Sequence, residues 1–98
     1  MSGTKKGYWI AMVSITDPER YPDYVAANKA AFDKYGARFL VRGGQASSPE
    51  GFAADRHVVI EFDSYATALA CYDSPEYQAA LKLRRSCSTA HFAIVEGP

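Results

Sequence analysis

Basic and titratable side chains recur where predicted strands and helices begin or end. Arg42 closes one predicted strand, Arg56 and His57 open the next, His91 opens the last, and Arg84 lies near the end of a predicted helix. The planar guanidinium of arginine suits a carboxylate, and histidine can transfer a proton near neutral pH. Two interpretations stay open: a rim pocket for a small organic anion, or solvated strand ends paired with nearby carboxylates.

Two further polar residues lie among apolar neighbours. Asn28 falls inside the apolar stripe of the first predicted helix, and a buried amide must find hydrogen-bond partners. It either binds backbone or tyrosine hydroxyls, or it faces a cavity between helices and sheet and orients a ligand. Tyr72 either lines a pocket mouth or packs in the core with its hydroxyl outward. The predicted ligand-binding residues are Asn28, Arg42, Tyr72 and Arg84.

The candidate catalytic residues are His57 and Glu61. Glu61 alternates with apolar residues on a strand expected to be central, so it is either a general base or the partner of an arginine. His57 and His91 are expected two strands apart, ~10 Å, which is too far for shared metal ligation. The two cysteines, Cys71 and Cys87, fit no zinc or redox spacing. No metal site and no cofactor are predicted.

The sequence pattern predicts the strands and helices that position these residues. Runs of β-branched and aromatic residues, bounded by turn and helix-cap residues, predict strands over residues 8–15, 37–42, 56–62 and 91–95. A helix capped by Thr16 or Asp17 is predicted to run to about Tyr35. Residues 65–73 and 75–85 form either two helices or one helix bent at Pro75.

The resulting order, βαββαβ, predicts an α+β fold of the ferredoxin-like kind, as a single domain over residues 1–98. Right-handed crossovers and one hairpin favour a four-stranded antiparallel sheet in the order 4-1-3-2, with both helical segments on one face. Helices cover only that face, and the strands carry apolar residues on both. We therefore expect a homodimer in which two sheets pack face to face, as in a dimeric α/β barrel.

Composition narrows the classes of partner. The chain is 48% hydrophobic and 22% charged, with a formal net charge of +0. Nucleic-acid binders carry a basic surplus, so no nucleic-acid partner is predicted. The apolar run at residues 8–15 has strand length, so neither a signal peptide nor a membrane span is predicted, and the expected location is cytoplasmic.

Short segments along almost the whole chain resemble DUF1330, a family of small bacterial proteins of unknown function in the dimeric α/β-barrel superfamily. The matching segments are KGYWI at 6–10, DPE at 17–19, YVAAN at 24–28, KYGARFLVRGG at 34–44, VIEF at 59–62, ACY at 70–72, SPEYQ at 74–78 and VEG at 95–97. The resemblance implies the same fold and paired sheets. It implies no activity, and the chain lacks the long insertions that bind haem in some relatives.

Two functions from different classes follow from these residues. The first is a small dimeric protein that binds a small organic anion, in one version a cofactor-independent enzyme doing acid–base chemistry. The alternative is a non-enzymatic homodimer that senses a metabolite or has a structural role.

Overall fold

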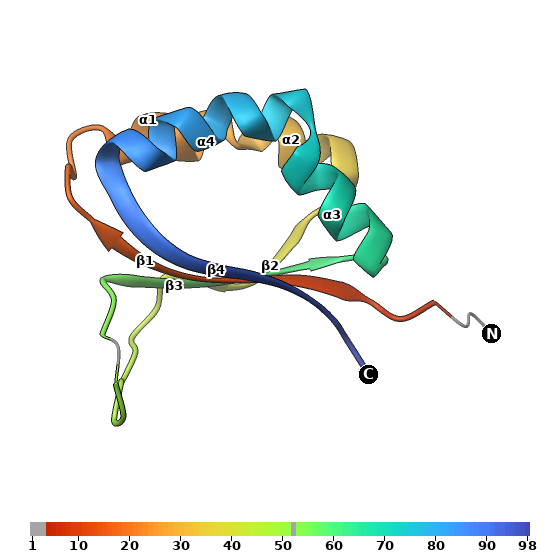
Figure 1. Cartoon of the computed structure of the whole chain (residues 1–98), viewed down its shortest axis with the longest axis horizontal. Helices are drawn as coiled ribbons and strands as arrows, with labels where there is room; N and C mark the ends of the chain where they lie inside the picture. Colours follow the sequence, from red (N-terminus) through yellow and green to blue (C-terminus); the bar gives the residue numbers. More distant parts are fainter. Residues whose placement is uncertain (1–3, 52) are drawn as a thin grey trace.

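The computed structural model describes residues 4–51 and 53–98 as a four-stranded sheet beneath four helices (Figure 1). Residues 1–3, in the N-terminal segment, and Phe52, in the predicted loop after Gly44, lie outside the described residues. The elements are β1 (Gly7–Ile15), α1 (Tyr21–Ala27), α2 (Lys29–Tyr35), β2 (Arg38–Arg42), β3 (Arg56–Phe62), α3 (Tyr65–Asp73), α4 (Pro75–Cys87) and β4 (Ser88–Glu96).

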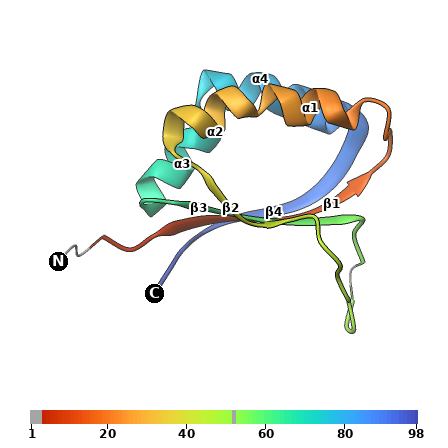
Figure 2. The ribbon, with the colours of Figure 1, turned by 180° about the vertical axis from the view of Figure 1, so that it is seen from behind.

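The sheet has the order β2-β3-β1-β4, and its neighbouring strands are antiparallel. This confirms the predicted ferredoxin-like fold and strand order. All four helices lie on one face of the sheet. The connection from β2 to β3 extends beyond the opposite face (Figures 1 and 2). We call the face without helices the open face.

Strand alternation decides which side chains enter the core. On β1, Trp9, Ala11 and Val13 are buried beneath the helices, while the intervening residues point to the open face. The Trp9 indole N–H donates to the carbonyl oxygen of Ala68 at 2.9 Å. Its ring packs edge-on against several aromatic rings, including those of Phe32, Tyr77 and Phe92. Trp9 therefore anchors helices from both halves of the chain to the sheet.

The first predicted helix differs from the observed one at its start and in its middle. The helix does not begin at a Thr16 or Asp17 cap, because the Asp17 side chain accepts from the Glu19 N–H at 3.2 Å in a preceding turn. The helix begins at Tyr21, with a proline in its first turn. It is also divided at Asn28, which ends α1 and begins α2 while keeping helical dihedral angles.

The second helical region is two helices that meet at Ser74. The Ser74 backbone is extended, and its hydroxyl caps α4 by accepting from the Tyr77 N–H at 3.1 Å. The same hydroxyl donates to the Cys71 carbonyl oxygen at 2.7 Å. The last strand is longer than predicted, since β4 begins at Ser88 directly after α4.

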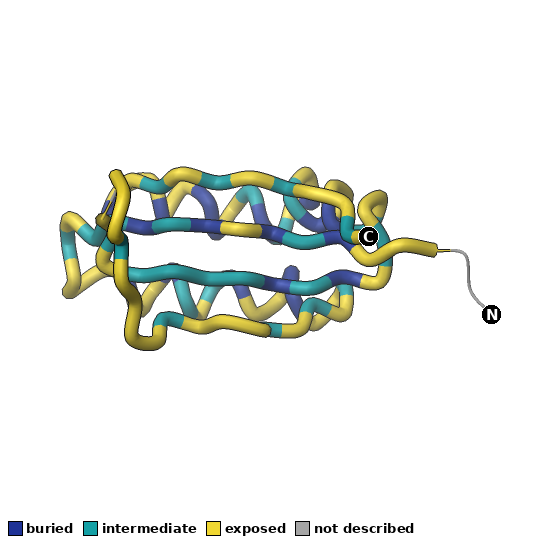
Figure 3. The backbone as a smooth tube through the Cα atoms, turned by 90° about the horizontal axis from the view of Figure 1, so that it is seen from below, coloured by how far each residue is buried: buried dark blue, intermediate teal, exposed yellow. Residues whose placement is uncertain are grey.

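Buried residues along the strands are separated by half-buried and exposed ones, which include the residues of the open face (Figure 3). Ile10, Val41 and Val95 are each about two-fifths exposed there. Met12 on β1 has His57 and His91 as its Cα partners on the two neighbouring strands. This face thus carries exposed apolar side chains on three strands, together with histidines on β3 and β4.

Candidate functional site

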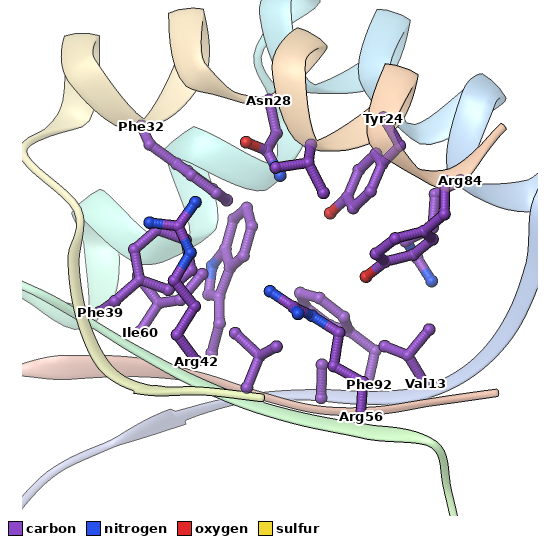
Figure 4. Close-up of a pocket in the computed structure, with 15 residues that line it drawn as sticks. Val13, Tyr24, Asn28, Phe32, Phe39, Arg42, Arg56, Ile60, Arg84 and Phe92 are labelled. Atoms are coloured by element: carbon purple, nitrogen blue, oxygen red, sulfur yellow. The ribbon is translucent and has the colours of Figure 1, made fainter. Parts of the chain in front are cut away.

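A cavity lies between the sheet and the helices α1 and α2 (Figure 4), and it is partly open to solvent. Its volume is about 30 Å³, space for roughly two water molecules. The free space is ≈ 480 Å³ when the open mouth is included. Three guanidinium groups, an amide and two tyrosine hydroxyls line it, and the rest of the wall is aliphatic and aromatic. The polar lining residues are Tyr21, Tyr24, Asn28, Arg42, Arg56 and Arg84.

Arg42 and Arg56 come from the two ends of the β2–β3 connection. Arg42 ends β2, and Arg56 begins β3. The Arg42 guanidinium carbon lies 4.3 Å from the centre of the Phe39 ring, and that of Arg56 lies 5.8 Å from the Tyr21 ring. Cation–π contacts of this kind hold each guanidinium against the cavity wall.

Arg84 reaches the cavity from the last turn of α4, where a cation is favoured by the helix dipole. Only 7% of its surface is exposed. Its guanidinium carbon lies 5.4 Å from the centre of the Phe92 ring on β4. A charged group is therefore buried in an aromatic wall.

Among the described residues, no carboxylate pairs with these three guanidiniums. The described residues that line the cavity include no aspartate or glutamate. None of the ion pairs formed within residues 4–51 and 53–98 involves Arg42, Arg56 or Arg84. The Nε atoms of Arg56 and Arg84 are buried and have no hydrogen-bond partner among the described residues. A buried donor without a partner is costly, and an anion in the cavity would remove that cost.

Tyr24, which lines the cavity, is hydrogen-bonded to the core residue Tyr77, with 2.8 Å between the two hydroxyl oxygens. Burial raises the pKa of Tyr24 well above its ordinary value, the neighbouring Tyr77 adds to the rise, and a hydrogen bond with Asn28 opposes it. Burial also raises the pKa of Tyr77, which hydrogen bonds with Tyr24 and Arg84 oppose. Both hydroxyls stay protonated near neutral pH, so they serve as hydrogen-bond donors and acceptors.

Asn28 combines the two roles that its sequence position left open. Its side chain is 8% exposed, lines the cavity and hydrogen-bonds Tyr24. Figure 4 shows its amide directed from the helices into the cavity. Asn28, Tyr24, Tyr77 and Arg84 therefore form one connected polar wall.

The two candidate catalytic residues lie away from this cavity. Arg56 and Val58 line the cavity, so His57 between them points to the open face. Glu61 also lies on the open face, where its carboxylate accepts from the Arg38 Nε–H at 3.0 Å and from the Tyr8 hydroxyl at 3.2 Å. The Arg38 hydrogen bond lowers the pKa of Glu61. The structure thus places both residues on the far side of the sheet from Arg84.

Tyr72, the fourth predicted ligand-binding residue, is not among the described lining residues. Its ring lies 5.5 Å from that of Tyr77 and 5.9 Å from that of Trp9. The cysteines lie apart from the cavity too. Burial raises the pKa of Cys71 to about 12 and raises that of Cys87. Both thiols are buried and protonated near neutral pH.

Three polar lining residues, Arg56, Tyr21 and Tyr24, are not among the predicted ligand-binding residues. Strand topology predicts Arg56 at the rim, but only Arg42 of this pair is among the predicted ligand-binding residues. Tyr21 and Tyr24 lie on the apolar stripe of the first helix, which is typical of core residues. The spacing of three and four residues from Tyr21 through Tyr24 to Asn28 puts three polar tips on one helix face, and this was the available signal.

The described part of the chain has no group of three or more histidine, cysteine, aspartate or glutamate side chains placed to hold a metal ion. None of its helices is both long enough and apolar enough to span a bilayer.

A family model, described as a domain of unknown function (DUF1330), matches residues 6–98. The chain belongs to the DUF1330 family. The comparison of this DUF1330 chain with curated proteins gave no match.

Solved structures similar to the DUF1330 chain share its fold at low sequence identity. A protein of unknown function from Rhodopseudomonas palustris is 16% identical with a TM-score of 0.76, covering 96% of this chain and 83% of that one. SnoaB, a cofactor-independent oxygenase from Streptomyces nogalater, is 11% identical with a TM-score of 0.65, covering 97% and 95%. A dimeric ferredoxin-like protein of unknown function from Thermobifida fusca is 17% identical with a TM-score of 0.60, covering 98% and 94%.

Proposed function

We propose that this DUF1330 protein binds a small organic anion, with a carboxylate as its acid group, in the cavity between α1–α2 and the sheet. The observation that carries the proposal is the group of three cavity guanidiniums, Arg42, Arg56 and Arg84, with no carboxylate among the described lining residues. A guanidinium offers parallel N–H donors that match the two oxygens of a carboxylate. The unpartnered Nε atoms of Arg56 and Arg84 supply two such donors inside the protein.

The remaining wall supports an apolar body for the ligand. Trp9, Phe32, Phe39 and Phe92 line the same space as the arginines. The volume of about 30 Å³ suits an acid group, and the wider mouth leaves room for a short chain or a single ring. Pockets of this composition, mostly apolar with a few placed polar groups, are typical of small-molecule sites.

The cavity favours binding over acid–base chemistry. Arginine stays protonated, and burial keeps the Tyr24 hydroxyl protonated as well. The candidate acid–base residues His57 and Glu61 lie on the open face, beyond reach of a molecule held by Arg84. We therefore propose the binding or sensing form of the function. The oxygenase activity of SnoaB belongs to a protein that shares the fold, and a shared fold does not carry an activity.

We also propose that the protein acts as a homodimer joined through the open face. The exposed apolar side chains of that face support this pairing, since Ile10, Val41 and Val95 would leave water. The connection from β2 to β3 extends past the face, where it would flank a partner sheet (Figure 1). The similar Thermobifida fusca protein is described as dimeric. The cavity lies on the other side of the sheet, so each protomer would carry its own site.

The proposed function is tested by calorimetric titration of the protein with butyrate and with benzoate. We expect binding by the natural chain and at least tenfold weaker binding by Arg56→Gln, which loses the central guanidinium. Arg85→Gln is the matched control, because Arg85 is an exposed neighbour of Arg84 on α4. Absence of binding of both acids, or equal weakening by the two variants, would contradict the proposal.

A further inference from the structure

We infer that the ligand carries two carboxylates, one at each end of a short apolar spacer, so that the site selects dicarboxylates over monocarboxylates. This inference rests on the proposed anion-binding function and specifies its ligand class. It is carried by the way the three guanidiniums are spread across the sheet rather than gathered at one point.

The arginines form a row across the sheet. Arg42 is held against Phe39 on β2, and Arg84 against Phe92 on β4. These are the two outer strands of the order β2-β3-β1-β4. At ~4.8 Å between neighbouring strands, their axes lie on the order of 14 Å apart. Figure 4 shows the Arg56 guanidinium in the middle of the cavity, with Arg42 and Arg84 on opposite sides.

A single carboxylate cannot pair with guanidiniums on opposite sides of the cavity (Figure 4). It spans one guanidinium, or two that converge, and would leave at least one cation of the row without a counter-charge. Arg84 is 7% exposed, so water replaces a missing partner poorly there. Arg42 lies at the exposed end of β2. One carboxylate shared by Arg84 and Arg56 and a second at Arg42 would give every cation of the row a partner.

The sheet side of the space between the ends of the row is apolar. Trp9, Ile60 and Val58 line the cavity on the two central strands. A hydroxyl or charge turned toward these side chains would lose hydrogen bonds to water. A short methylene chain or a single ring would bury apolar surface there instead. The chemistry therefore favours two acid groups joined by a spacer that is apolar on its sheet side.

The test compares acids that differ only at the far end: butyrate with succinate, and hexanoate with adipate. Affinities are measured by calorimetric titration at constant ionic strength. In the natural chain we expect one of the dicarboxylates to bind at least tenfold more tightly than its monocarboxylate. In Arg42→Gln that advantage should disappear, because the dicarboxylate should lose at least tenfold more affinity than the monocarboxylate. Arg85→Gln should behave like the natural chain.

The other outcomes would overturn either the two-carboxylate inference or the proposed function. Equal affinities within both pairs would overturn the two-carboxylate inference and leave the proposed anion site intact. Equal weakening of mono- and dicarboxylates by Arg42→Gln would also overturn it, because Arg42 would then not serve a second acid group. If none of the four acids binds, the proposed function itself fails. Arg42 is exposed, so the variant should fold, and its thermal melting curve checks this.

Discussion

The central guanidinium of the cavity, that of Arg56, depends on the absence of a side chain at Gly43. A Cβ atom at residue 43 would lie 2.7 Å from the Nη1 atom of Arg56, and the glycine has a φ of +68°. The Gly43 N–H donates to the His57 carbonyl oxygen at 2.9 Å, which fixes the backbone at this point. Gly43, which follows β2, therefore makes room for the Arg56 guanidinium in the cavity.

Gly43→Ala should weaken anion binding by about tenfold, because the methyl group would displace the Arg56 guanidinium. It should also lower the free energy of unfolding by about 1 kcal/mol, since alanine is strained at positive φ. Gly44→Ala is the matched control, as a Cβ atom there meets nothing within 4 Å. Calorimetric titration with butyrate and thermal melts measure both effects. Equal affinity in the two variants would contradict this role of Gly43.

At the scale of elements, the division between α1 and α2 places Asn28 in the roof of the cavity. The Asn28 N–H still donates to the Tyr24 carbonyl oxygen at 2.9 Å, and the Phe32 N–H donates to the Asn28 carbonyl oxygen at 3.1 Å. The backbone hydrogen bonds thus run through the junction. The Asn28 side-chain amide takes no part in these backbone hydrogen bonds, so it can bond to Tyr24 and line the cavity.

Asn28→Asp should raise the melting temperature by a few degrees and abolish butyrate binding. A carboxylate in the cavity would supply the negative charge that the three arginines lack, so it would compete with an external anion. Asn28→Ala, which only removes the amide, should instead lower the melting temperature, because the hydrogen bond to Tyr24 is lost. If the aspartate variant melted below the natural chain and still bound butyrate, the cavity charges would not act as proposed.

The strands, their order and the break at Ser74 could be predicted from the sequence because alternation, caps and turn residues are local signals. The start of the first helix was misplaced because Asp17 caps a turn, while Pro22 marks the first helical turn. Strand topology brought Arg42 and Arg56 to one rim. Topology alone did not show which face of the sheet each of these residues points to. Arg56 and His57 are consecutive on β3, so one side chain enters the cavity and the other lies on the open face.

Tyr72 shows a different limit of sequence reasoning. An amphipathic tyrosine can serve a core or a pocket mouth, and the choice depends on which rings surround it in three dimensions. In the structure its neighbours are Trp9, Tyr77 and Phe92, from three different elements. No local spacing encodes that set of contacts.

At the scale of the whole molecule, ion pairs connect elements that enclose the cavity. The Lys34 Nζ donates to the Glu76 carboxylate at 3.0 Å and so joins α2 to α4. A hydrogen bond from its own backbone N–H, and then the Lys34 ammonium, lower the pKa of Glu76. A carboxyl whose pKa is lower in the folded state stabilises the fold above the unfolded pKa of 4.5, and that stabilisation is lost as pH falls through the folded value.

Glu76→Gln should therefore be less stable than the natural chain at pH 7. The difference should shrink as the pH falls below 4.5 and vanish once the natural carboxyl is protonated as well. Urea unfolding at a series of pH values measures this. Glu19→Gln serves as control, since Glu19 is an exposed carboxylate outside the ion pairs of the described residues. A difference that stayed constant as the pH fell well below 4.5 would show that Glu76 acts by packing instead of by charge.

The proposed dimer makes a prediction about the open face. Ile10 lies on the central strand β1 and is 41% exposed, while Leu83 on the outer side of α4 is 39% exposed. Ile10→Lys should convert a dimer into a monomer, because it would bury an unpaired charge between the sheets. Leu83→Lys should remain dimeric. Native mass spectrometry measures the two masses, and a monomeric natural chain would contradict the proposed pairing.

The most direct test of the anion site is an NMR titration that follows the arginine Nε–H signals. Butyrate and adipate are added to ¹⁵N-labelled protein, and each signal is assigned by its Arg→Lys variant. We predict large, saturable shifts of the Arg56 and Arg84 signals, whose Nε atoms are buried without a partner, and no shift for the exposed Arg85. If the Arg56 and Arg84 signals stay in place while either acid reaches millimolar concentration, the cavity is not an anion site.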